Sequence, residues 1–117
     1  MNFDEAINAH AGWKQKLSTY IAKPDGSLKS SEVSSDRNCA LGKWIYLSET
    51  QHSAMPEFST LKREHARFHT AAGNVIRKAD LGERVADEIA LGANSEYAVA
   101  SGAVVSALMA MKSKLGQ

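Results

Sequence analysis

Residues 56–82 read PEFSTLKREHARFHTAAGNVIRKADLG and form a long amphipathic stretch of this 117-residue chain. Apolar side chains recur there every three or four residues, which is the spacing of one face of a helix. Pro56 suits the first helical position, Ser53 is a candidate cap before it, and Leu81-Gly82 ends the pattern. The stretch therefore predicts one long helix, and a histidine lies in its apolar stripe. The stripe consists of Phe58, Leu61, His65, Phe68, Ala72, Val75 and Ala79.

Two further stripes predict long helices on either side of this one. The first runs from Phe3 to Ile21 and stops at the turn sequence 23–26, KPDG. The last begins near Val85 and is weakened at Gly92, where a break is expected. Its apolar side comprises Val85, Ile89, Ala93, Tyr97, Ala100, Val104, Leu108, Met111 and Leu115.

The chain between the first two long helices has a different character. Residues 22–38 are polar and serine-rich, with no apolar period, and predict a long mobile connection. A short helix is expected from about 37 to 48, capped by Asp36. Its apolar residues, which we expect to anchor it on the bundle, are Leu41, Trp44, Ile45 and Leu47.

Together these patterns predict an all-α fold and a single domain over residues 1–117. We expect a four-helix bundle variant with three long antiparallel helices and one short helix that carries the cysteine. No strand-type alternation persists anywhere in the sequence.

Composition narrows the possible partners. The chain has 14 Lys+Arg and 13 Asp+Glu, a formal charge of +1, so no basic stripe favours nucleic acid. No apolar run reaches the roughly 18–20 residues that span a membrane, and no signal peptide is recognisable at the start. Together with a single cysteine, these features predict a cytoplasmic protein without a disulfide.

Three histidines and the cysteine carry the chemistry. His10 lies in the first apolar stripe, and His65 and His69 are four residues apart on one helical face. A lone inward histidine is usually a hydrogen-bonded core residue, but three without a shared partner would cost several kcal/mol. Cys39, at the start of the short helix and near Arg37, is expected to favour its thiolate. One Zn²⁺ would satisfy all four residues, because a tetrahedral site accepts three imidazoles and one thiolate. The remaining histidine, His52, is expected to be exposed.

Four protein ligands would leave no open position on the metal, so we expect a protein that is not an enzyme. Other readings remain open. Copper suits the same donors, a di-iron bundle needs more histidines and inward carboxylates, and a metal-free helical module leaves the histidines unexplained.

Three short motifs resemble those of the chemoreceptor zinc-binding domain family. They are His10-Ala11-Gly12-Trp13, Cys39-Ala40-Leu41-Gly42-Lys43-Trp44 and His65-Ala66-Arg67-Phe68-His69, in that order. Ser95-Glu96-Tyr97, followed by Ser101 and Val104-Val105, is similar to the last helix of that family. The likeness extends over essentially the whole chain.

The resemblance implies a helical, often dimeric regulatory module of bacterial chemoreceptors or diguanylate cyclases. It also implies zinc held by His10, Cys39, His65 and His69, and a response to zinc or hypochlorous acid through the bound cysteine. The chain begins at Met1 without a signalling or cyclase domain, so a free-standing member or an excised segment is expected. We hypothesise that Cys39 is the mobile ligand; the alternative is a structural zinc in a dimerisation or scaffold domain.

Overall fold

The computed structural model describes residues 3–37, 39–82, 92 and 95–116. These residues form helices and no strands, which confirms the all-α class. The helices are α1 (Phe3–Ala22), α2 (Ser30–Val33), α3 (Ala40–Leu47), α4 (Glu49–His52), α5 (Pro56–Asp80) and α7 (Glu96–Lys114).

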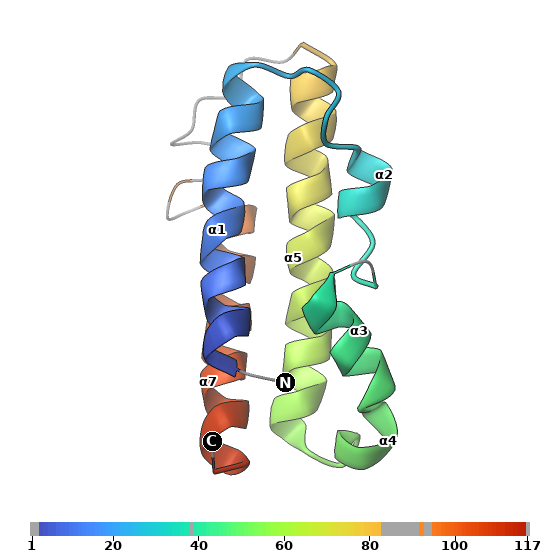
Figure 1. The fold of residues 1–117 in the computed structure, drawn as a ribbon, viewed down its shortest axis with the longest axis vertical. Coiled ribbons are helices and arrows are strands. Elements are labelled where there is room, and N and C mark those ends of the chain that lie inside the picture. The colour runs from blue at the N-terminus through green and yellow to red at the C-terminus, as the bar shows by residue number, and fades with distance from the viewer. Residues whose placement is uncertain (1–2, 38, 83–91, 93–94, 117) are drawn as a thin grey trace.

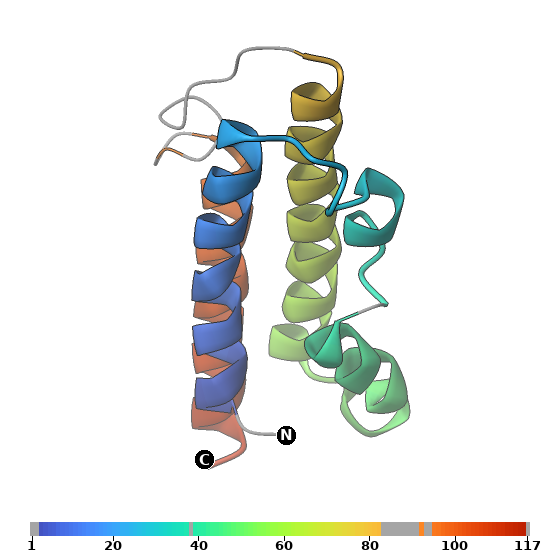
Figure 2. The same cartoon turned by 45° about the horizontal axis from the view of Figure 1, so that its top comes forward.

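The three long helices, α1, α5 and α7, pack side by side (Figures 1 and 2). α1 and α5 run in the same direction, and α7 runs back against both. Two contacts fix these directions: Lys112 on α7 forms an ion pair with Asp4 at 2.8 Å, and Tyr20 donates a hydrogen bond to Asp80 at 2.5 Å. The predicted bundle is confirmed. The prediction that all three long helices are antiparallel is wrong, since α1 and α5 are parallel. The reason is that the segment between them, which contains α2, α3 and α4, runs back along α5 before α5 begins.

The three predicted apolar stripes form the core. Every predicted stripe residue of α5 is buried, and on α7 the predicted residues from Tyr97 to Met111 are buried too. The expectations for Val85, Ile89 and Ala93 lie outside the described residues. α7 begins at Glu96, where the Ser95 hydroxyl accepts a hydrogen bond from the backbone N–H of Ala98 at 3.1 Å.

The expected loop over residues 22–38 contains a helix. α2 buries Val33 against α5, with 8% of that residue exposed. A helix of four residues is too short to display a periodic apolar pattern, so the sequence carried no signal for it.

The residues that precede α3 and α5, and one apolar residue of α3, differ from the prediction. α3 begins at Ala40 with Cys39, not Asp36, as its cap, and α5 is preceded by Met55 rather than capped by Ser53. Leu41 and Ile45 do anchor α3, but Leu47 is 83% exposed. Asp36 instead accepts a hydrogen bond from the Tyr46 hydroxyl at 2.6 Å.

Candidate metal centre

The site begins with two histidines on α5. His65 and His69 lie one turn apart, so both project from the same face, and both are buried at 0% and 2% exposure. Their Nε2 atoms are 3.1 Å apart. The helix therefore presents two imidazole nitrogens to one point.

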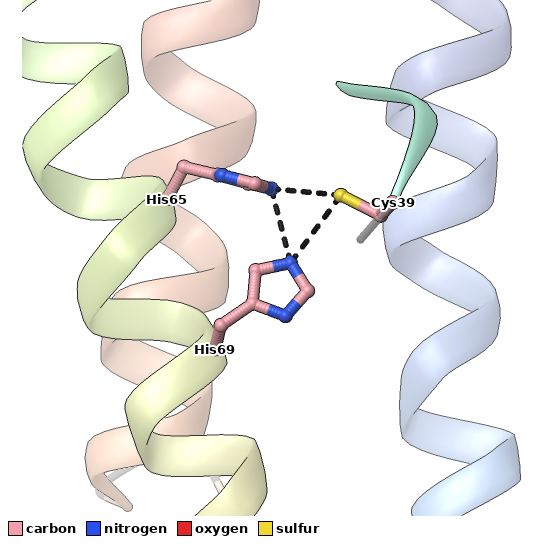
Figure 3. Close-up of side chains that lie close together, drawn as sticks. All are labelled: Cys39, His65 and His69. Carbon is pink, nitrogen blue, oxygen red and sulfur yellow. Dashed lines mark hydrogen bonds between the residues drawn. The ribbon is translucent and has the colours of Figure 1, made fainter. Parts of the chain in front are cut away.

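Cys39 completes a triangle with these nitrogens (Figure 3). Its Sγ lies 3.2 Å from Nε2 of His65 and 3.4 Å from Nε2 of His69. As the cap of α3, the same sulfur accepts a hydrogen bond from the backbone N–H of Gly42 at 3.3 Å. Three of the four predicted ligands thus converge from α5 and the start of α3.

The triangle has the dimensions of one face of a zinc tetrahedron. Zn–S bonds of about 2.3 Å and Zn–N bonds of about 2.0–2.1 Å place tetrahedral donors about 3.5 Å (S to N) and about 3.3 Å (N to N) apart. The three distances here fall within a few tenths of an ångström of those edges. The donors fit zinc in type and in spacing.

The ring of His69 is oriented by α2. Its Nδ1 lies 2.8 Å from the carbonyl oxygen of Val33, which accepts the Nδ1 proton. In the neutral imidazole the Nε2 lone pair then faces the sulfur and the other histidine, as a metal ligand requires. This contact could not be predicted from the sequence, because the acceptor is a backbone oxygen of a helix that the sequence pattern does not reveal.

His10 lies beside the triangle on α1. It is 4% exposed, and its ring centroid is 5.5 Å from that of His65 and 4.5 Å from that of Phe68. Its donor atoms lie outside the group formed by the other three ligands. Its Nδ1 is buried and has no hydrogen-bond partner among the described residues, and the same is true of Nδ1 of His65.

Burial keeps these imidazoles neutral. Desolvation, followed by the charge of His69, lowers the pKa of His10 to about 4. The same two causes, with His10 added, lower the pKa of His65 to about 3, and burial also lowers the pKa of His69. Neutral imidazole is the form that binds a metal.

The expectation of a favoured thiolate at Cys39 is wrong for the metal-free protein. Burial raises the pKa of the Cys39 thiol, and this outweighs the hydrogen bond from the Gly42 N–H. Arg37, which was expected to favour the thiolate, instead stacks its guanidinium 3.8 Å from the centroid of the Tyr46 ring. A bound cation would reverse the balance, because a coordinating thiol is deprotonated by the metal.

Gly42 allows α3 to approach so closely. A Cβ there would lie 1.7 Å from the backbone oxygen of Asp36 and 3.3 Å from Cε1 of His65. Only a residue without a side chain fits between that turn and the ligand. The sequence motif contains this glycine, but its role becomes apparent only from the contact.

Two clefts reach Cys39 from outside. One, of about 480 Å³, lies between α1 and α3 and is lined by His10, Trp13 and Trp44. The other, of about 510 Å³, lies between α2 and α3 and is lined by Glu32 and His69. Cys39, which is itself half-buried, lines both.

His52 takes no part in the centre. It is half-buried rather than exposed, with its ring centroid 5.9 Å from that of Trp44 and 5.8 Å from that of Phe58. It therefore packs as part of the apolar contact between α3, α4 and α5.

Comparison with known proteins identifies the family. The family model for the chemoreceptor zinc-binding domain matches residues 10–76, which is more than half of the chain and includes all four predicted ligands. Searches of curated proteins and of solved structures returned no significant match. None of the helices in the described ranges has the length and apolar character needed to cross a bilayer. With the donor triangle of α3 and α5 and this match, the chain belongs to the chemoreceptor zinc-binding domain family.

Proposed function

We propose that this chain is a zinc-binding sensory domain whose Cys39 responds to zinc level or to oxidants such as hypochlorous acid. The observation that carries the proposal is the triangle of Cys39 Sγ with the Nε2 atoms of His65 and His69. Two of these donors lie on α5, the longest helix described, and the third belongs to the residue that caps the short helix α3. Zinc would therefore tie α3 to the bundle.

His10 is the fourth ligand in this proposal. Its support is position and chemistry: it is a buried, neutral imidazole beside His65, with an unpartnered Nδ1. With His10 bound, the coordination shell is closed, and no exchangeable position remains for water or substrate. We accordingly propose that the domain is a sensor and not an enzyme.

Cys39 is the ligand suited to release. The two histidines on α5 are fixed by a 25-residue helix, whereas Cys39 caps a helix of eight residues. Apart from zinc, that helix is held by buried Leu41 and Ile45 and by Trp44, which packs edge-on against Phe3 at 5.6 Å between ring centroids. Loss of one ligand would free α3 without disturbing the core of α5 and α7.

The oxidation is a two-electron step. The thiolate of Cys39 and hypochlorous acid give sulfenic acid and chloride, with sulfur oxidised and chlorine reduced. Sulfenic acid is the first, reversible product, and the clefts on both sides of Cys39 supply a route for a small oxidant. Sulfur that has lost its thiolate charge is a poorer zinc ligand.

Fluorescence tests the release. In a Trp13→Phe background Trp44 is the sole tryptophan, so its emission reports the packing of α3 alone. Stoichiometric hypochlorous acid added to the zinc-loaded protein should shift the emission to the red and speed amide exchange over residues 39–48. The Cys39→Ala variant is the control for oxidation of methionines: it should show the red-shifted emission before oxidant is added and no further change after it. Consumption of the thiol with unchanged emission and exchange would contradict the sensor.

A structural zinc in a dimerisation or scaffold domain is the alternative. Its support is α7, where residues 97–111 carry no charge although Val99 and Met109 are 46% and 59% exposed. A helix that is apolar all round is usually covered. Chelator at sub-denaturing concentration distinguishes the two functions: a change in the Trp44 emission or in self-association supports the sensor, and insensitivity supports the structural role.

The family suggests the setting. We propose a homodimer that passes its signal to chemoreceptor or diguanylate cyclase signalling proteins, without contact to nucleic acid or membrane. The near-neutral charge supports the absence of a nucleic-acid partner. A single cysteine that must stay reduced supports a cytoplasmic location.

A further inference from the structure

α2 contacts the metal centre through the ring of His69. The carbonyl of Val33 accepts the Nδ1 proton of His69 at 2.8 Å. Nδ1 of His65 and Nδ1 of His10 are both buried without a partner in the described part of the chain. Among the three imidazoles, His69 alone therefore has its tautomer fixed through Nδ1 by a residue that the structure describes.

The position of α2 depends on a glycine of α5. A Cβ on Gly73 would lie 2.0 Å from Oγ and 3.1 Å from Cβ of Ser34, and 3.2 Å from the backbone oxygen of Ser30. Ser34 closes the last turn of α2, with its hydroxyl donating to that same oxygen at 2.5 Å. Gly73 is thus a notch into which α2 fits, one helical turn beyond His69.

Burial and packing support a seated α2. Val33 is 8% exposed and belongs to the core cluster, and α2 lies against α5 in both views (Figures 1 and 2). The Val33 carbonyl reaches His69 only from this seat. Displacing α2 by the width of a side chain would break the hydrogen bond, since such bonds weaken steeply beyond about 3.2 Å.

We propose that α2 is a clamp on the zinc ligand His69, so that the seating of α2 at Gly73 and the binding of zinc are coupled. A seated α2 presents Nε2 of His69 to the metal, and a bound metal holds the ring that α2 contacts. By linkage, the factor by which α2 raises zinc affinity equals the factor by which zinc stabilises the seated α2. Val33 and Gly73 are positioning residues, and neither touches the metal.

A clamp differs from a helix that merely packs. A packing helix would contribute to global stability without changing zinc affinity, whereas the clamp changes zinc affinity in the folded protein. Partners of the hydrogen-bonded nitrogen of a metal-bound histidine typically change metal affinity about 10–100-fold. The proposal rests on zinc occupying the site described under the proposed function.

Gly73→Leu is the direct test. The new side chain fills the notch, so we expect zinc affinity to fall about 10–100-fold in competition with a chromophoric chelator. Gly12→Leu and Gly102→Leu are matched controls, because both glycines lie inside long helices and a Cβ at either meets nothing within 4 Å. Their zinc affinities should equal that of the wild type. Equal affinity in Gly73→Leu and the controls would overturn the clamp.

Cobalt substitution separates a clamp from a lost ligand. Co²⁺ bound to Gly73→Leu should keep the thiolate charge-transfer band, since Cys39 remains a ligand, while binding more weakly. A cobalt complex of unchanged affinity would overturn the proposal in the same way as unchanged zinc binding.

Amide exchange in the wild-type protein tests the clamp without any variant. It therefore remains available if Gly73→Leu does not fold. The N–H groups of Val33 and Ser34 bond to Lys29 and Ser30 at 3.0 and 2.9 Å only while α2 is formed. Zinc should slow their exchange by about the same 10–100-fold. Equal exchange rates at these two amides with and without zinc would overturn the clamp.

A second substitution that restores zinc binding tests whether the contact between Gly73 and Ser34 is the one that matters. Gly73→Ala should weaken zinc binding, because its Cβ meets Ser34, and Ser34→Gly removes both nearest atoms. The double variant should bind zinc as tightly as Ser34→Gly alone, and additive losses would count against the notch. Absence of any zinc binding by the wild type would instead refute the proposed function, so the two failures are distinguishable.

Discussion

At the scale of the residue, the centre is a set of polar groups placed in an apolar core. His10, His65 and His69 are all at most 4% exposed, and the buried Nδ1 atoms of two of them have no partner within the described ranges. Such burial costs stability in the absence of a metal. The core is therefore arranged for metal binding at the expense of the metal-free state.

The buried histidines predict a pH dependence of the metal-free protein. An imidazole in the unfolded chain titrates near 6.5, whereas the pKa of His10 is about 4 and that of His65 about 3. Between these values the unfolded chain binds protons that the folded chain does not, so the free energy of unfolding falls as pH falls. The loss begins near pH 6.5 and continues to pH 3–4.

Urea unfolding of the metal-free protein at pH 7.5 and 5.5 measures this effect. Each of the two imidazoles should contribute a loss of about 1 kcal/mol over that interval. Equal free energies of unfolding at the two pH values would contradict the burial of neutral histidines.

At the scale of the element, the long helices could be predicted and the short ones only in part. The stripes of α1, α5 and α7 are long enough to show a period, and they placed His10, His65 and His69 on inward faces. α2 has four residues and one buried side chain, so neither it nor the Val33 carbonyl could be predicted. The motifs correctly predicted that Cys39, His65 and His69 lie together. The contact that orients His69 could not be predicted in this way, because its acceptor is a backbone carbonyl oxygen.

Because the turn before α3 packs tightly against Gly42, we expect a single added methyl group there to weaken zinc binding strongly. Gly42→Ala would place a Cβ 1.7 Å from the oxygen of Asp36, so the start of α3 must move and carry Cys39 with it. We expect zinc affinity to fall at least about 10-fold, measured by chelator competition. Gly102→Ala is the control and should bind zinc normally while gaining about 0.5–1 kcal/mol of stability from helix propensity. Equal zinc affinity of the two variants would show that the close approach is dispensable.

At the scale of the whole molecule, the three long helices pack together, and α2, α3 and α4 lie outside this group of three (Figure 2). α2 packs against α5, whereas Trp44 of α3 contacts both Phe3 of α1 and Phe58 of α5. The metal centre lies at that junction, between the long helices and the segment of short ones. The other notable surface is α7, whose uncharged residues 97–111 include exposed Val99 and Met109. If the proposed sensor self-associates through α7, signal input and self-association use different sides of the bundle.

The α7 surface predicts the effect of a charge on association. If a second copy covers α7, Met109→Glu should convert a species of two chains into one of 12.6 kDa, because a buried carboxylate without a partner is costly. Leu47→Glu, at an apolar residue of α3 that is 83% exposed, is the control and should leave the mass unchanged. Sedimentation equilibrium measures both. A Met109→Glu protein with the mass of the wild type would exclude this face as the interface.

Zinc K-edge X-ray absorption on untagged, zinc-loaded protein, with the metal content determined on the same sample, tests the central claim most directly. We predict one zinc per chain with one sulfur at about 2.3 Å and three nitrogens at about 2.0–2.1 Å. His10→Ala should lose one nitrogen from that shell, and Cys39→Ala should lose the sulfur. A shell without sulfur, or a protein that takes up no zinc when zinc is supplied, would contradict the account.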